Sequence, residues 1–183
     1  MRIRAASLQN RERDTIDAAL AVEEFVNADT IAQGLSAYRP EAAAVAAGRV
    51  MLQRLRFLAR VRRDFAFETT LAGVGHERWL QQLHASGYRS HLVFLALPSA
   101  ALAVARVAER VRQGGHDVPE DVIRRRYASG LRNLFATYMP AVHGWQVYDN
   151  SDIGGPGMIA SGGAGQTFRI AGPIAWTGLE EQR

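Results

Sequence analysis

The segment Gly87–Ser99, GYRSHLVFLALPS, decides the fold class of this chain. Within it, His91–Leu97 is a continuous apolar run that ends at Pro98, which is typical of a strand buried on both faces. Ser99 follows as a helix N-cap before the stretch ALAVA, whose all-round apolar character predicts burial. A buried strand that leads into a helix indicates an α/β protein with a mostly parallel sheet.

The segments on both sides continue this alternation. Apolar runs predict further strands at Phe25–Asn27, Phe65–Thr69 and His143–Tyr148. Apolar spacing and capping residues predict helices over 14–24, 40–63, 75–86, 99–113 and 119–138. In the helix over 40–63, four apolar residues are predicted to line one face: Val45, Leu52, Leu55 and Ala59.

The two ends of the chain carry weaker signals. Residues 1–13 are polar and rich in arginine, and we expect them to be frayed or disordered. The residues after Ile153 are rich in glycine and contain short strand-like pieces. We therefore divide the chain into a divergent or disordered N-terminus over 1–24, a core over 25–163 and a C-terminal extension over 164–183.

The composition excludes several kinds of chemistry. The 183 residues suit a single domain with a sizeable core, and 48% of them are hydrophobic. Cysteine is absent, which excludes disulfides, a thiolate nucleophile and cysteine metal sites. All 22 residues counted as Lys+Arg are arginine, which excludes a Walker A lysine and lysine Schiff-base chemistry.

Hydropathy and charge bear on the partners of the protein. No stretch reaches the roughly 18 to 20 apolar residues of a membrane span. The N-terminal residues also lack the apolar core of a signal peptide, so we expect a cytoplasmic protein without membrane contacts. The net charge of +4 fits either solvated helix faces or anionic partners such as phosphates. Nucleic acid is disfavoured because aromatic residues do not alternate with the arginines, and the five histidines show no metal-ligand spacing.

Polar side chains follow the predicted strands at the points where the strands end. Asn27 and Asp29 follow the first strand, and Glu68, Thr69 and Thr70 end or follow the second. Ligands of open parallel sheets bind beyond the carboxyl ends of the strands, so these side chains are expected on one rim. Two carboxylates, an amide and hydroxyls suit general-base or Mg²⁺ chemistry.

Several motifs in order resemble the zeta-toxin family of P-loop kinases. They are FVNADTIAQGL, FAFETTLAG, GYRSHLVFLALPS, RVAERVRQGGHDVPEDVIRRRY and WQVYDNS, and the resemblance covers about Glu24 to Gly163. It implies a three-layer P-loop kinase-like fold and an ATP-dependent kinase, with Mg²⁺, that phosphorylates UDP-N-acetylglucosamine or a similar nucleotide-sugar. It also implies an antitoxin protein as a partner, since many members are paired with one.

The resemblance assigns roles to the residues of the rim. Asp29 matches the catalytic base of the family, although a carboxylate there also suits the first turn of a helix. Glu68 matches a carboxylate that contacts the substrate, and Asn27, Thr69 and Thr70 are expected to bind the same ligand. The alternative for this group is a capped turn between a strand and a loop.

Four arginines are predicted to bind the phosphates of ATP: Arg106, Arg110, Arg124 and Arg125. Arg106 and Arg110 lie four residues apart, so they share one helix face. Guanidinium forks suit phosphate oxygens, and the resemblance places such arginines beside the lid of the kinase. In the run 124–126 at most one or two side chains can face a single site, and the others are expected to be solvated or paired with Glu120 and Asp121.

The chain departs from the family in its N-terminal segment. Members carry a strand and a Walker A loop, G-x-x-x-x-G-K-[ST], ahead of the motif that contains Asp29. Here residues 11–24 read RERDTIDAALAVEE, without glycine or lysine, and the glycines over 162–165 and 170–178 have the wrong spacing. We therefore expect the central N-terminal strand to be missing, and the chain to be poorly stable for that reason.

Two functions remain open. One is a zeta-toxin-like kinase that is truncated and weakly active as given. The other is a non-catalytic pseudokinase remnant that binds an anionic ligand or a protein partner.

Overall fold

The computed structural model describes residues 2–5, 22–37, 39–115, 117–152 and 154–183. Their strands form one sheet in the order β2-β3-β1-β4-β5-β6-β7. The strands β2, β3, β1, β4 and β5 pair in parallel, while β6 and β7 are antiparallel. The bounds are β1 Arg2–Ala5, β2 Phe25–Val26, β3 Ala66–Thr69, β4 His91–Ala96, β5 Gly144–Asp149, β6 Gly157–Gly163 and β7 Gln166–Ile170. The predicted α/β fold with a mostly parallel sheet is confirmed.

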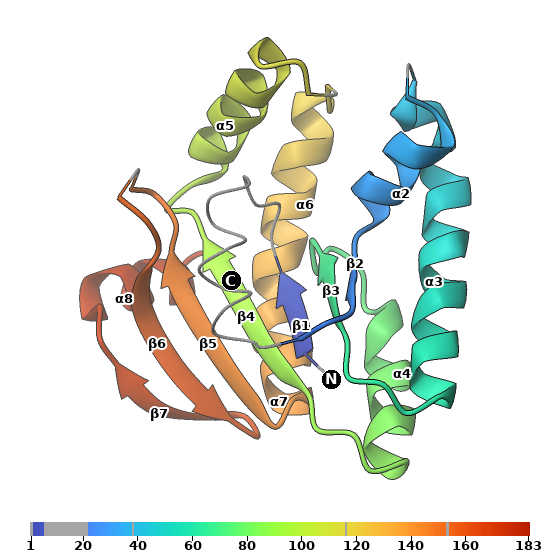
Figure 1. The fold of residues 1–183 in the computed structure, drawn as a ribbon. Coiled ribbons are helices and arrows are strands. Elements are labelled where there is room, and N and C mark those ends of the chain that lie inside the picture. The colour runs from blue at the N-terminus through green and yellow to red at the C-terminus, as the bar shows by residue number, and fades with distance from the viewer. Residues whose placement is uncertain (1, 6–21, 38, 116, 153) are drawn as a thin grey trace.

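The strand β1 corrects the expectation that the central strand is missing. It lies between β3 and β4 and pairs in parallel with both, with Ile3 opposite Phe67 on one side and Leu92 on the other (Figure 1). Residues 2–5 are therefore a strand, although the composition of 1–13 indicated disorder. Pairing on both sides gives this short segment its structure, so β3 and β4 have the central partner whose absence was expected to destabilise the sheet.

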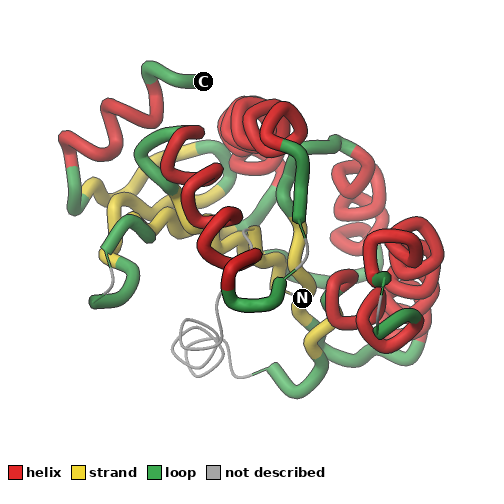
Figure 2. Tube along the Cα trace, turned by 90° about the horizontal axis from the view of Figure 1, so that it is seen from above, coloured by secondary structure: helices red, strands yellow, loops and turns green. Residues whose placement is uncertain are grey.

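The helices connect the strands over most of the chain. Their bounds are α2 Ala28–Leu35, α3 Ala44–Arg60, α4 Gly75–Ala85, α5 Ala100–Arg112, α6 Glu120–Asn133, α7 Met139–Ala141 and α8 Pro173–Glu180. A 3₁₀ turn, η1, covers Pro40–Ala43, and one π-helical segment, η2, covers Leu134–Tyr138. Seen from above, α2 and α3 lie beside the β2 end of the sheet and α8 lies at the opposite end (Figure 2).

Of two predictions about apolar helix faces, the one for α3 holds only in part and the one for α5 is wrong. In α3 the predicted Leu55 is buried and Ala59 packs against the core, whereas Val45 is 71% exposed and Leu52 is 41% exposed. The apolar spacing therefore gave the helix correctly but placed the buried stripe about a quarter-turn away. No residue of α5 is fully buried, because α6 is its principal neighbour.

The main core lies on the sheet face that α6 covers. In β4, Leu92 and Ala96 point into this core, and Val93 and Leu95 contribute to a smaller cluster with Tyr148. Alternation along a strand buried on both faces accounts for the apolar run quoted above. The C-terminal α8 closes the far end of the core, where the rings of Trp145 and Trp176 stack nearly parallel with their centroids 5.7 Å apart.

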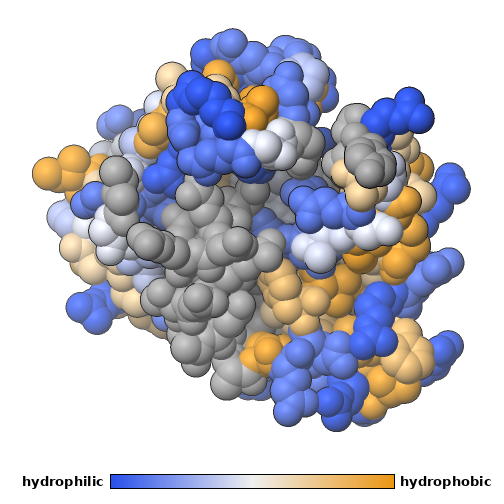
Figure 3. Space-filling view, turned by 45° about the horizontal axis from the view of Figure 1, so that its top comes forward, coloured by the Kyte–Doolittle hydropathy of each residue, from blue (hydrophilic) through white to orange (hydrophobic). Residues whose placement is uncertain are grey.

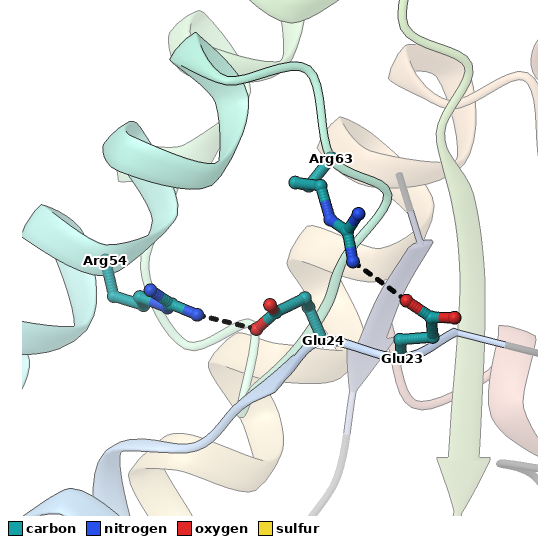
Figure 4. A network of polar contacts seen from close by, with 4 residues as sticks. All are labelled: Glu23, Glu24, Arg54 and Arg63. Atoms are coloured by element: carbon teal, nitrogen blue, oxygen red, sulfur yellow. Dashed lines mark hydrogen bonds and ion pairs between the residues drawn. The ribbon is translucent and has the colours of Figure 1, made fainter.

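Two ion pairs fasten the segment before β2 to the α3 region. The Arg54 guanidinium lies 2.8 Å from a Glu24 carboxylate oxygen, and Arg63 lies at the same distance from Glu23 (Figure 4). The backbone N–H of Ala66 also donates to the Glu24 carbonyl at 2.7 Å. Both ion pairs are largely exposed, and such pairs contribute about 0–1 kcal/mol each, so they position the edge strand more than they stabilise it.

Candidate functional site

The site begins at the carboxyl end of β2, where Asn27 connects two carboxylate-bearing segments. Its Nδ2 donates a 2.6 Å hydrogen bond to Glu68 at the end of β3. Its Oδ1 accepts from the backbone N–H groups of Asp29 at 2.7 Å and Thr30 at 3.1 Å, so Asn27 is the N-cap of α2. Asn27 is 7% exposed. Both functional ends of its amide are therefore used within the protein.

Asn27 links the backbone of Asp29 to the side chain of Glu68. Asp29 lies in the exposed first turn of α2, where the positive end of the helix dipole interacts favourably with its carboxylate. Glu68 is half-buried at the end of the adjacent strand. The sequence predicted Asn27, Asp29 and Glu68 on one rim, and in the structure the Asn27 side chain bonds both to the Glu68 carboxylate and to the backbone N–H of Asp29.

Thr69 and Thr70 begin the loop that follows β3. The Thr69 hydroxyl accepts from the backbone N–H of Leu71 at 3.2 Å, and the Thr70 hydroxyl accepts from that of Ala72 at 3.4 Å. These bonds fold the chain into two overlapping side-chain turns. Thr70 is exposed and Thr69 is half-buried at the end of β3.

The predicted phosphate-binding arginines lie on α5 and α6, across the carboxyl edge of the sheet from α2 (Figure 1). Arg106 and Arg110 are half-buried on α5, whereas Arg124 and Arg125 are exposed on α6. The Nη2 of Arg124 lies 2.7 Å from a carboxylate oxygen of Glu120. Hydrophilic residues gather over the outer end of these two helices (Figure 3). The structure thus places the four arginines on one helix pair and engages Arg124 in an ion pair.

The end of β5 forms a turn beside this edge. The Asp149 carboxylate accepts from the backbone N–H of Ser151 at 2.8 Å, and the Asn150 backbone N–H donates to the Ala96 carbonyl at 2.9 Å. Asn150 is buried against the end of β4. Asp149 and Asn150 therefore close the turn between β5 and the residues that follow.

A polar cluster at the opposite edge of the sheet was not found from the sequence. The Ser90 hydroxyl lies 2.8 Å from His84 Nε2 and 3.5 Å from His143 Nδ1, and the two imidazole rings are 4.4 Å apart. Desolvation, and then the charge of His143, lower the pKa of His84 below its ordinary value near 6.5. The spacing of 6 and 53 residues from Ser90 carries no motif, so no sequence signal marks this cluster.

The residues present do not supply the phosphate cradle of a P-loop kinase. The strand β1 ends at Ala5 on the carboxyl edge, so the cradle is expected in the residues that follow. Residues 6–24 contain neither glycine nor lysine, and the chain has no lysine at all. Among the described residues, no three His, Asp or Glu side chains gather as metal ligands. The glycines and the lysine of a Walker A loop are therefore not found in residues 6–24.

Comparison with protein families gives one assignment. A family model described as "Zeta toxin" matches residues 17–153, about three quarters of the chain. An uncharacterized protein of Haemophilus influenzae is 28% identical over 107 residues, which are 58% of this chain and 76% of that protein. In the described residues no helix has the length and apolarity needed to cross a membrane.

Two solved structures share the fold. One, from a study of the PezAT chromosomal toxin–antitoxin system of Streptococcus pneumoniae, has a TM-score of 0.62 at 14% identity and aligns over 100% of this chain and 86% of its own. The other, the crystal structure of AvrRxo1-ORF1:-ORF2 with ATP, has a TM-score of 0.69 at 13% identity. This chain spans 63% of that second protein, less than two thirds of its length. At these identities the likeness concerns the fold alone.

Proposed function

This chain belongs to the zeta toxin family, and we propose that it carries the acceptor-binding half of an ATP-dependent phosphotransferase. The proposed acceptor is a nucleotide-sugar or a similar small molecule with a free hydroxyl. The observation that carries the proposal is the hydrogen-bonded unit of Asn27, Asp29 and Glu68 at the carboxyl edge of the sheet. The kinase-like fold of the two solved structures supports it.

The roles of the carboxylates follow from where they lie. Asp29 is exposed at the start of α2, so it can accept the proton of an acceptor hydroxyl as a general base. Glu68, fixed by Asn27, can accept a hydrogen bond from a second hydroxyl and orient the sugar. Arg106 and Arg110 on α5 supply positive charge for anionic oxygens of the ligand.

The binding of the phosphate donor depends on groups that differ from those of a Walker A loop. Without a Walker A lysine and glycines, the chain as it stands is expected to bind ATP weakly and to turn over little or not at all. This observation favours a second candidate function, a non-catalytic module that binds the acceptor or a protein partner. Pairing with an antitoxin protein is proposed on family grounds.

Calorimetric titration of residues 1–183 with UDP-N-acetylglucosamine, with and without ATP and Mg²⁺, tests both candidates. Micromolar binding without ATP, lost in Glu68→Ala, supports an acceptor site, and a coupled assay of ATP consumption then separates a kinase from a binding module. Val74→Ala, an exposed change in the following loop, is the control and is expected to bind normally. If the unaltered chain shows no heat with this ligand or with UDP, the assignment of the acceptor is wrong.

A further inference from the structure

One helical segment, formed by α6 and η2, holds the loop that follows β3 through several contacts. The Asn133 side chain at the end of α6 donates to the Leu71 carbonyl at 2.8 Å, and the Tyr138 hydroxyl donates to the Gly73 carbonyl at 2.6 Å. At Gly130 the helix backbone lies so close that an added Cβ would be 2.6 Å from the Thr70 carbonyl oxygen. Three contacts from one helical segment, at Thr70, Leu71 and Gly73, therefore fix the path of this loop.

The loop needs this support because its backbone is strained. Leu71 has a φ of 53°, in the left-handed region, and its side chain is fully buried in the main core. For a residue other than glycine that region is unfavourable, and it persists only where the surroundings impose it. The helix widens into a π-helical segment over Leu134–Tyr138 where it meets the loop, and such segments occur often at functional sites.

This conformation sets what the two threonine hydroxyls can do. Each accepts a hydrogen bond from a backbone N–H two residues ahead, so each keeps its own O–H proton for a donor interaction. The rim at Thr69 and Thr70 is therefore suited to oxygen atoms that accept hydrogen bonds. Sugar hydroxyl oxygens and the oxygens of a diphosphate have this chemistry.

We propose that Gly130, Asn133 and Tyr138 are positioning residues for ligand recognition. They hold the loop carbonyls toward the helix. In this loop conformation the hydroxyls of Thr69 and Thr70 can donate hydrogen bonds to ligand oxygens. The recognition step rests on the acceptor site proposed above, whereas the support of the loop by the helix stands on the contacts alone.

Two variants and one matched control test the proposal. Tyr138→Phe removes the donor to Gly73 and keeps the buried ring, and Gly130→Ala places a methyl group against the Thr70 carbonyl. Gly48→Ala is the control, because Gly48 also lies within a helix and a Cβ there meets no atom within 4 Å. The readouts are amide hydrogen exchange over residues 69–74 and the affinity for UDP-N-acetylglucosamine.

The rate of amide exchange over 69–74 is expected to rise about tenfold in Tyr138→Phe, because the loss of one buried hydrogen bond has an effect of that size. The rate is expected to rise further in Gly130→Ala and to stay unchanged in Gly48→Ala. The affinity for the nucleotide-sugar is expected to fall by a similar factor in both variants. Unchanged exchange in Tyr138→Phe overturns the support of the loop. Faster exchange with unchanged affinity overturns the link to recognition. Failure of the unaltered chain to bind refutes the acceptor site and recognition with it, and exchange still decides whether the helix supports the loop.

Discussion

Replacing Asn27 by alanine is the perturbation that examines the site most directly. The change removes the hydrogen bond to Glu68 and both bonds that cap α2. Loss of an N-cap costs about 1 kcal/mol. Loss of a hydrogen bond to a charged group costs roughly 1.5–3 kcal/mol, and the 7% exposure of Asn27 leaves little water to replace it. The free energy of unfolding is therefore expected to fall by about 3 kcal/mol.

Thermal and urea unfolding, followed by circular dichroism, measure this loss. For a chain of this size about 3 kcal/mol corresponds to a fall in Tm of roughly 6–12 °C. Asn27→Ser is the matched variant, because its hydroxyl can still cap α2 but is too short to reach Glu68 as the amide does. It is expected to lose about 2 kcal/mol, mostly the bond to Glu68. If Asn27→Ser unfolds within about 0.5 kcal/mol of the unaltered chain, the bond to Glu68 contributes little and the reasoning is refuted.

Three further predictions concern the core, the histidine cluster and the phosphate donor. Gly162→Ala is expected to destabilise the chain by about 3 kcal/mol in urea unfolding, since its Cβ would lie 2.0 Å from a backbone oxygen, whereas Gly154→Ala meets no atom within 4 Å and is expected to be nearly neutral. The lowered pKa of His84 means that the unfolded chain binds more protons than the folded chain, so the free energy of unfolding is expected to fall as the pH drops below about 6.5. In His84→Gln it is expected to fall less, and an equal dependence of stability on pH in both proteins would contradict this. A Walker A sequence in place of residues 6–13, directly after β1, is expected to give ATP-dependent phosphorylation that Asp29→Asn abolishes, and normal turnover with asparagine at position 29 would show that another group is the base.

The sequence was sufficient for most of the sheet because buried strands carry a strong local signal. The run at His91–Ala96 and the apolar strands Ala66–Thr69 and Gly144–Asp149 could be placed from periodicity alone. The strand Arg2–Ala5 could not be, because RIRA places two arginines in four residues and resembles a solvated tail. Its strand structure comes from its partners on both sides, which no local pattern encodes.

The candidate site divides in the same way. The rule that strands end on one rim brought Asn27, Asp29 and Glu68 together correctly, because it depends only on parallel topology. The rule did not reveal that the Asn27 side-chain amide forms hydrogen bonds with Glu68 and with the first turn of α2. The support of the loop by Tyr138 was also missed, because it joins residues 65 positions apart through a backbone carbonyl. Contacts between a side chain and a distant backbone leave no pattern in the sequence.

The presence of β1 changes what the missing Walker A sequence means for the protein. A missing central strand would leave backbone groups of β3 and β4 unpaired. Each buried group without a partner costs roughly 1–3 kcal/mol, so the whole sheet would be destabilised. Here both strands pair with β1, and the departure from the family falls on the phosphate cradle that follows Ala5. The departure in sequence therefore bears on the proposed phosphate donor site more than on the folding of the sheet. We therefore expect affinity for the proposed acceptor without turnover, and the titration and the coupled assay together test this combination.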